Sequence, residues 1–419
     1  MRAHPDRALW FDQPFPDGLR LRAARGLYAL ALVLMPACLI ATPWGLTPAA
    51  CCTLAAVLLA PDRLWAARRA AGWPVLGMLL VALCVVGVVS FSVLVHHDTW
   101  SEAGTRGRVL VIPLASLLVL GLSPPRAALW SGAVIGLIGA CVVALVQTLH
   151  GLDRADGWNN AITFGDMAVL LLVLVVFLRP SGRFVLTVVA TAAGLVAIGL
   201  SGTRGAWPAA ALVVAIALFA RGSGGGAHRL EAWVLAVLAL AAVAAVSPQV
   251  QQRVDALQID MLRYASGDSD TSAGARLQLM GLAGDELEAD PWVGVGVGRF
   301  ERVLAAAPAC QVAVPDAWCQ LGHAHSDFPE WGATMGIPGL VALVLLYGVP
   351  AWLFLRRLNV RPFPRRSRSA ALAGLVVVVS FVLCGLSQSM WAHQLSGGTY
   401  LTLVGILLGF SLREDPRKA

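Results

Sequence analysis

Charged residues are scarce in this chain. Asp, Glu, Lys and Arg together make up 13% of its 419 residues, and hydrophobic residues make up 58%. Soluble domains contain about 25% charged residues. The mean hydropathy is +0.73. This composition excludes an ordinary soluble domain and predicts an integral membrane protein.

Other signals are missing as well. The net charge of +7 comes from basic residues in short loops, and no aromatic-interleaved basic patch indicates nucleic-acid binding. Residues 1–26 are polar before the first apolar run, so we expect no cleavable signal peptide. No cluster of Cys and His has zinc-binding spacing, so we expect no metal or other cofactor.

Long apolar runs dominate what is present. A membrane-crossing helix needs about 20 mostly apolar residues, and the runs predict an all-α polytopic protein with about 12 such helices. The expected spans are residues 26–42, 44–60, 74–95, 108–122, 128–149, 161–178, 184–200, 206–220, 231–246, 336–355, 370–390 and 398–412.

The distribution of basic residues orients these spans. With about 12 spans and a cytoplasmic N-terminus, most Lys and Arg residues fall in cytoplasmic loops, as the positive-inside rule requires. We therefore expect both termini in the cytoplasm. The expected organisation is transmembrane helices at 1–246, a long outer loop at 247–335 and further transmembrane helices at 336–419. The basic residues left on the outer side are Arg106, Arg108, Arg154, Arg204, Arg253, Arg263, Arg276, Arg299 and Arg302.

The outer loop is the one long polar stretch, and half of the 24 Asp and Glu residues lie in it or at its end. Two of the eight cysteines, Cys310 and Cys319, lie there too. An oxidising outer compartment would allow a disulfide between them, but spacing alone leaves free thiols as the alternative. The other six lie in apolar runs and are interpreted as small hydrophobic residues.

Two arginines are candidates for binding an anion. Arg204 lies in SGTRGAW at the outer end of a span. A membrane-anchoring arginine is the alternative, but anchors are expected on the inner side, and a planar guanidinium suits phosphate. Arg276 begins an amphipathic segment, SAGARLQLM, which is expected to lie along the membrane face. Spacing alone favours a surface arginine paired with nearby acids.

GHAHSDFPEWG (322–332) places two histidines and two carboxylates just before a span. Histidine is the usual general base near neutral pH, and metal binding is the competing use. His325 is the first candidate base and His323 the reserve. The supporting candidates at the same outer face are Asp327, Glu330, Arg106, Arg108, Asn159 and Asn160.

Two further motifs favour structural roles. The glycine run in PWVGVGVGRFE lacks the Lys-Ser/Thr of a phosphate-binding loop, so it predicts a tight turn before a helix. His393 and Trp391, in MWAHQLSGG, are interpreted as interfacial packing residues.

The order of these motifs resembles a known family. SGTRGAW at an outer helix end, followed by ARLQLM, DPWVGVGVGRF and HAHSDFPEWGATMGIPGL, looks like the O-antigen ligases and polymerases, which also include bacterial protein O-oligosaccharyltransferases. Residues 150–345 carry the resemblance, and GWNNAITFG is similar to the family's entry to a middle helix. Ser326 and Pro329 depart from the pattern, in which an amide residue and a leucine are usual.

The resemblance implies a GT-C-like membrane glycosyltransferase of the inverting type that needs no metal. It implies a bacterial inner-membrane enzyme that moves a glycan from undecaprenyl pyrophosphate to lipid A–core oligosaccharide at the periplasmic face, in lipopolysaccharide biosynthesis. The family's two arginines fall on Arg204 and Arg276, which would bind the pyrophosphate. Its histidine falls on His325, the expected general base.

Alternative functions follow from the same residues. An O-antigen polymerase would join two lipid-linked glycans, and a protein O-oligosaccharyltransferase would use a Ser or Thr acceptor. A transporter or flippase, from a different class, would carry ionisable residues in the middle of its spans. Asp166 is the main residue of that kind here, so the transporter class is disfavoured.

Overall fold

The computed structural model describes residues 18–222, 271–313, 315–359 and 365–413, together with 251, 255, 258–260, 262, 263 and 266. These residues form α-helices and short 3₁₀ helices (η), with no β-strand among them. The helices are α1 (Leu19–Cys38), α2 (Thr47–Leu59), α3 (Pro61–Val95), η1 (Trp100–Arg108), α4 (Val111–Leu122), α5 (Arg126–Leu149), α6 (Ala161–Phe177), α7 (Phe184–Ser201), α8 (Ala206–Gly222), α11 (Ser272–Ala289), α12 (Glu301–Ala306), η2 (Pro308–Cys310), η3 (Ala317–Gln320), α13 (Asp327–Leu358), α14 (Arg365–Gly385), η4 (Met390–Ala392) and α15 (Gln394–Arg413).

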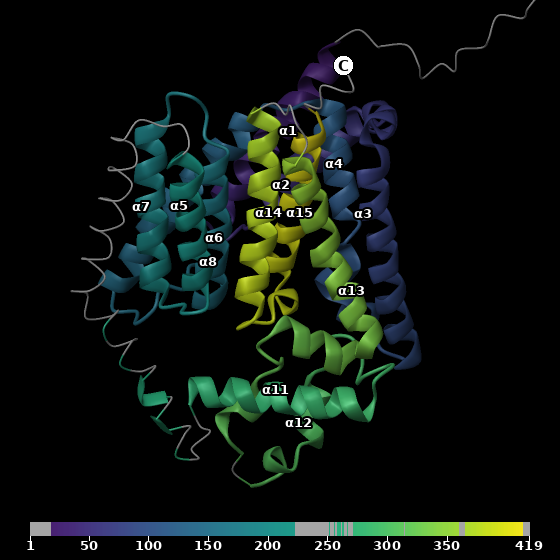
Figure 1. Ribbon diagram of the computed structural model, residues 1–419, viewed down its shortest axis with the longest axis vertical. Coiled ribbons are helices and arrows are strands. Elements are labelled where there is room, and N and C mark those ends of the chain that lie inside the picture. The colour runs from purple at the N-terminus through teal and green to yellow at the C-terminus, as the bar shows by residue number, and fades with distance from the viewer. Residues whose placement is uncertain are drawn as a thin grey trace, which may run out of the picture.

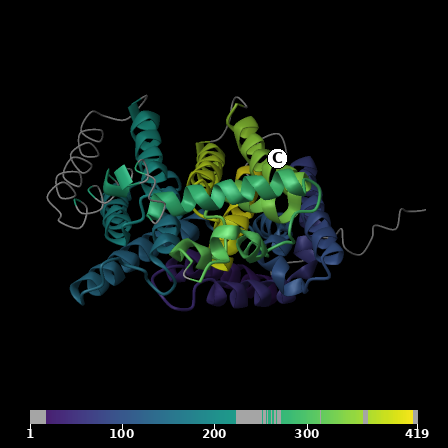
Figure 2. The ribbon, with the colours of Figure 1, turned by 90° about the horizontal axis from the view of Figure 1, so that it is seen from below.

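The molecule has two layers. An upright bundle contains α1–α8 and α13–α15, and a smaller lobe with α11 and α12 lies across one end of it (Figure 1). Seen from that end, α11 runs across the bundle rather than along it (Figure 2). Among the described residues, seven helices are long and apolar enough to cross a bilayer: α1, α3, α5, α7, α13, α14 and α15. The fold is that of a multi-pass membrane protein.

The predicted spans coincide with helices wherever the structure describes them. Three helices are apolar but shorter, at Thr47–Leu59, Ala161–Phe177 and Ala206–Leu218. The span expected at 231–246 lies outside the described residues, so the total of about 12 crossings stays a prediction. Helix α13 begins at Asp327, and its helical backbone is interrupted at Gly336, next to the domain boundary expected at residues 335 and 336.

Helix α6 lies at the centre of the bundle. Apart from Thr163 and Asp166, its sequence, AITFGDMAVLLLVLVVF, is apolar all round, and nearly every one of its side chains is buried, as expected of a helix surrounded by others. Small residues let neighbouring helices approach closely. Gly132 and Gly136 on α5 face the backbone carbonyls of Val33 and Pro36 on α1, where a Cβ atom would have no room.

The lobe has its own hydrophobic core. Leu279 and Ala283 on α11 are buried against Phe300, Leu304 and Trp318 from the segment that follows. A helix around Arg276 therefore exists as expected, and its buried residues pack into the lobe. Leu277 of the expected apolar face is exposed, and the position of the helix along the membrane face stays a prediction.

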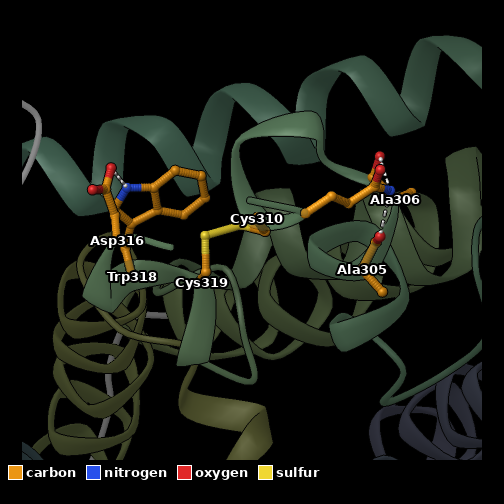
Figure 3. Close-up of a disulfide and its surroundings, with 7 residues drawn as sticks. Ala305, Ala306, Cys310, Asp316, Trp318 and Cys319 are labelled. Atoms are coloured by element: carbon orange, nitrogen blue, oxygen red, sulfur yellow. Dashed lines mark hydrogen bonds between the residues drawn. A yellow bond between two sulfur atoms is a disulfide. The ribbon is translucent and has the colours of Figure 1, made fainter. Parts of the chain in front are cut away.

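A disulfide closes the distal part of this lobe. Cys310 and Cys319 are bonded, with their Cα atoms 5.5 Å apart, a usual separation for a disulfide. Beside them the indole nitrogen of Trp318 donates to the Asp316 carboxylate at 3.0 Å (Figure 3). The bridge joins η2 to η3 and so restrains a segment that has little regular structure.

Removing this disulfide is expected to destabilise the lobe. A short closed loop restricts the unfolded chain, so the double variant Cys310→Ser/Cys319→Ser should lose about 2–3 kcal/mol of unfolding free energy. Limited proteolysis and thermal melting, with and without reductant, measure the effect. The control is Cys51→Ser, at an exposed free cysteine on α2. Equal melting temperatures for wild type and the double variant would contradict this expectation.

The lobe is docked onto a break in α13. Gly336 has a non-helical backbone (φ 62°, ψ −158°), a conformation open to glycine. The Pro291 carbonyl occupies the gap and accepts the Ile337 amide at 2.7 Å. Just before the break, the Val295 amide donates to the Ala333 carbonyl at 3.0 Å.

The glycine run is a turn, as the sequence predicts. Gly294, Gly296 and Gly298 all have positive φ angles. The amide of Val297, between them, donates to Ser92 Oγ on α3 at 2.9 Å. The run thereby fixes the start of the lobe against α3 and α13, and α12 follows it.

Candidate functional site

Arg204 lies in the turn between α7 and α8. Helix α7 ends at Ser201, and Gly202 caps it in the left-handed conformation, which glycine adopts readily. Thr203 holds the turn in place because its hydroxyl donates to the Ala161 carbonyl at the start of α6, at 2.6 Å. The Arg204 guanidinium then pairs with the Asp260 carboxylate at 3.3 Å, with 22% of its side chain exposed.

Two glycines bring this turn against its neighbours. A Cβ atom on Gly165 of α6 would collide with Ser201 and Thr203, and one on Gly205 would collide with the Ser387 side chain. Ser387 lies in the loop between α14 and η4. The start of α6, the turn that carries Arg204 and the loop after α14 therefore meet at one end of the bundle.

Arg276 approaches the same place from the lobe. It lies in the first turns of α11, which begins after Thr271, whose hydroxyl accepts the Gly274 amide at 3.0 Å. Burial lowers the pKa of the Arg276 guanidinium, the charge of Arg204 lowers it further, and Asp166 and Asp260 act in the opposite direction. The two candidate arginines are therefore close enough to repel each other, a geometry suited to one shared anion.

Asp166 is the buried carboxylate of this site. It lies in the second turn of α6, is 1% exposed, and is within interaction range of Arg276 and of the Cys384 thiol on α14. The sequence places Asp166 inside a predicted span, but no pattern in the sequence indicates which residues lie near it. The fold brings the charge of Arg276 within range of it, while both carboxylate oxygens of Asp166 lack a hydrogen-bond partner among the described residues.

Three histidines gather at the same end of the bundle, and the charge of Arg276 acts on one of them, His325. The His323 and His325 rings are 4.3 Å apart, and the His393 ring is 5.5 Å from that of His323. Gln388 bridges two of them: its Oε1 lies 2.9 Å from His325 Nδ1, and its Nε2 lies 2.6 Å from His393 Nε2. The Nε2 atom of His325 is buried and has no hydrogen-bond partner among the described residues.

Burial keeps these imidazoles neutral. It lowers the pKa of His325, and the positive charge of Arg276 lowers it further, while the hydrogen bond to Gln388 acts in the opposite direction. Burial also lowers the pKa of His323, to about 3, and that of His393. Because a neutral imidazole has a free electron pair, His325 can accept a proton at neutral pH.

His325 also has an unusual backbone. Its φ angle is +53°, uncommon for a residue other than glycine and of the kind that gathers at functional sites. The surrounding contacts hold it there. The Ser326 hydroxyl donates to the Gly385 carbonyl at 3.3 Å, and the Ala324 amide donates to the Glu330 carboxylate at 2.7 Å.

Four of the supporting candidates have structural partners. Asn160 caps α6 by accepting the Thr163 amide at 2.8 Å. Asp327 is fully buried and accepts the Tyr347 hydroxyl at 2.7 Å. The other two, Arg106 and Glu330, form an ion pair at 3.3 Å with side chains that are 4% and 2% exposed.

Arg108 and Asn159 lie nearer the surface. Arg108 is exposed, and its guanidinium is 3.4 Å from Gln394 Oε1. Asn159 lines a small hollow with Trp158, Phe164 and Leu395. Neither has an interaction with the histidines or with Arg276 among the described contacts.

Breaking the Arg106–Glu330 pair is expected to destabilise the protein strongly. Removing one partner leaves a buried, unpaired charge, so Arg106→Ala or Glu330→Ala should cost about 3–5 kcal/mol of unfolding free energy. The double variant Arg106→Met/Glu330→Leu removes both charges and should recover a large part of that loss. Thermal melting of the three variants measures it, and additive losses would show that the two side chains are not coupled.

Gln388 and His393 are the residues that the sequence interpretation missed. It assigned His393 to interfacial packing, which is wrong, because the residue belongs to the histidine cluster. Trp391 does pack, since it is buried against Trp331, Phe381 and Tyr400. The available signal was the short polar break LSQS between two apolar runs, directly before MWAH.

The described residues contain no group of three or more His, Cys, Asp or Glu side chains placed to hold a metal ion. The arrangement instead presents two arginines for an anion and a neutral histidine for a proton. The chain is therefore a multi-pass membrane protein with a cluster of polar side chains at one end of its helical bundle.

Part of the chain is similar to a known protein family. Residues 186–344, less than half of the chain, match the family model described as O-antigen ligase, so this segment is similar to that family. The match includes Arg204, Arg276 and His325, and it confirms the resemblance seen in the sequence. A protein of Haemophilus influenzae described as uncharacterized is 24% identical over 316 residues, which cover 72% of this chain and 78% of that protein.

Proposed function

We propose that this protein is an O-antigen ligase. It transfers a glycan from undecaprenyl pyrophosphate to lipid A–core oligosaccharide. The observation that carries the proposal is the convergence of Arg204, Arg276 and His325, from three separate parts of the chain, at one end of the bundle. The family match supports the general kind of reaction, an enzyme of ligase or polymerase type acting on lipid-linked glycans.

The first part of the mechanism is proton removal. The Nε2 atom of His325 takes the proton of the acceptor hydroxyl as that oxygen attacks the anomeric carbon of the glycan. The bond from the anomeric carbon to the pyrophosphate oxygen breaks in the same displacement, so the configuration at that carbon inverts. The proton stays on His325 until it is released to solvent.

The second part is stabilisation of the leaving group. Negative charge develops on the pyrophosphate as the bond breaks, and preorganised donors are most effective where charge develops. Arg204 and Arg276 supply that positive charge, since each guanidinium can bind phosphate oxygens through two N–H groups. We therefore propose that no metal is needed. Asp260 pairs with Arg204 until the substrate arrives, and the nearby charge of Asp166 favours the charged form of Arg276.

The orientation belongs to the same proposal. A disulfide in the lobe that carries Arg276 supports an oxidising compartment on that side. We place the lobe and the site on the periplasmic face of the bacterial inner membrane and both termini in the cytoplasm. The lipid tail of the donor would then remain in the bilayer while its pyrophosphate reaches the arginines.

The test is reconstitution with defined substrates. The purified protein in lipid nanodiscs is mixed with an undecaprenyl-pyrophosphate glycan in EDTA, with lipid A–core, with no added acceptor, or with a Ser/Thr peptide. Glycan on lipid A–core supports a ligase. Growth of lipid-linked chains indicates a polymerase, and a modified peptide indicates a protein transferase. If no glycan moves although the protein is folded, the proposal is wrong, and donor flipping in vesicles is measured instead.

A further inference from the structure

Gln388 occupies an unusual position for an amide side chain. It lies in the loop between α14 and η4 and is 2% exposed. Its two polar atoms contact two different imidazoles, His325 at 2.9 Å and His393 at 2.6 Å. A buried amide with both ends used in this way has little freedom to rotate.

The contacts fix the positions of the protons. Oε1 can only accept, so His325 carries its proton on Nδ1, and Nε2 is left with its electron pair. Nε2 of Gln388 can only donate, so His393 accepts at its own Nε2 and carries its proton on Nδ1. The bare Nε2 of His325 is the buried atom that has no partner among the described residues.

The loop that carries Gln388 is held rigidly against the histidine loop. The Trp391 amide donates to Asp327 at 3.3 Å, and its indole nitrogen donates to the Tyr347 hydroxyl at 2.8 Å. Asp327 itself accepts that hydroxyl at 2.7 Å. Asp327 therefore anchors Trp391. Because Asp327 follows His325 by two residues and Trp391 follows Gln388 by three, one buried network positions both the amide and the imidazole ring.

We propose that Gln388 is a positioning residue that selects the proton-accepting form of His325. This inference rests on the proposed function. Gln388 holds the Nδ1–H tautomer, directs Nε2 toward the bound acceptor, and stabilises the imidazolium as it forms, because the Nδ1–H donor keeps its acceptor throughout. The opposite orientation of the amide would put the proton on Nε2 and leave no base there, so the tautomer is the decisive observable.

The experiment compares three variants. Gln388→Ala removes the acceptor and should lower kcat about 10²-fold, within the range that general-base catalysis contributes, with little change in KM for the donor. Gln388→Glu keeps an acceptor and adds a negative charge, which favours imidazolium. Gln394→Ala is the matched control, because Gln394 is an exposed glutamine in the neighbouring helix whose side chain contacts Arg108.

The pH profile separates positioning from a general loss of structure. The titratable or charged groups that face His325 are Arg276 on α11, His323 in its own loop and His393 before α15. These groups stay the same in Gln388→Glu. The acid limb of the rate profile should therefore move to higher pH in that variant alone, whereas a merely unstable variant would lower the rate at every pH.

A second readout does not depend on glycan transfer. Nitrogen-15 NMR of histidine-labelled protein, with His325 assigned by its loss in His325→Gln, reports which ring nitrogen carries the proton. Nδ1–H in the wild type and a mixture of tautomers in Gln388→Ala are expected. Nε2–H in the wild type, or an unchanged tautomer and pH profile in both Gln388 variants, would overturn the inference. An inactive wild type with the expected tautomers would instead count against the proposed function.

Discussion

Replacing His325 by glutamine is expected to reduce kcat for glycan transfer by about 10²–10⁴-fold, the range that a general base contributes. Glutamine has a similar reach and polarity but cannot accept a proton at neutral pH. Binding of the donor should change little, because the arginines that hold its pyrophosphate are intact. Initial rates over a range of donor concentrations give kcat and KM separately.

His323→Gln is the matched control for this variant. The His323 ring lies 4.3 Å from that of His325, so both variants disturb the same packing. Burial lowers the pKa of His323 to about 3, which makes it a weak base. We expect the larger loss for His325→Gln. The reverse order would identify His323 as the base and would remove His325 from that role.

The pH dependence of the wild type follows from the same cause. A base works in its neutral form, so the rate falls as pH drops through its pKa. Because burial and then Arg276 lower the pKa of His325, the acid limb is expected below the ordinary histidine value of about 6.5. His325→Gln should lose this limb. A wild-type limb well above that value would mean that another group is being titrated.

Replacing Arg276 has the second largest expected effect. Arg276→Ala should lower kcat by about 10²–10³-fold, the scale of losing one donor to a developing anion. Arg276→Lys should recover only a part, because an ammonium group cannot bind two phosphate oxygens side by side. The change should be mainly in kcat, since the charge on the leaving group is greatest in the transition state.

The control for Arg276 is Arg263→Ala, at an exposed arginine of the same outer loop. It should keep most of the activity. Arg204→Ala is expected to behave like Arg276→Ala, and the double variant should lose less than the product of the two single losses if both guanidinium groups bind one pyrophosphate. Fully multiplicative losses would indicate that the two arginines bind different groups.

The helices could be predicted because hydrophobicity is a local property. The apolar runs coincide with α1–α8 and α13–α15, although ends differ. Helix α14 stops at Gly385, several residues before the predicted end at 390, at a position where a Cβ atom would collide with the Asp327 carboxylate. Helix α13 starts earlier than expected because its polar first turn, with Asp327 and Glu330, is buried with partners instead of lying in a loop.

The arrangement of the site could be predicted only in part. Arg204, Arg276 and His325 were found through short motifs, but spacing alone made Arg276 a surface residue. Gln388 is 63 positions from His325 in the chain, and Arg106 is 224 positions from Glu330. Such pairs depend on how the helices pack, and no local pattern in either partner indicates the other.

The break in α13 has a consequence for exchanging parts between related proteins. The carbonyl of Pro291 completes the backbone hydrogen bonding of Ile337, and Val295 and Gly296 bond to Ala333 and Thr334. A chimera that combines the outer loop of another protein with the native α13 would lose these backbone hydrogen bonds between loop and helix. Segments 290–298 and 327–339 should therefore be exchanged together as one unit. This holds although 28 residues of chain lie between 298 and 327.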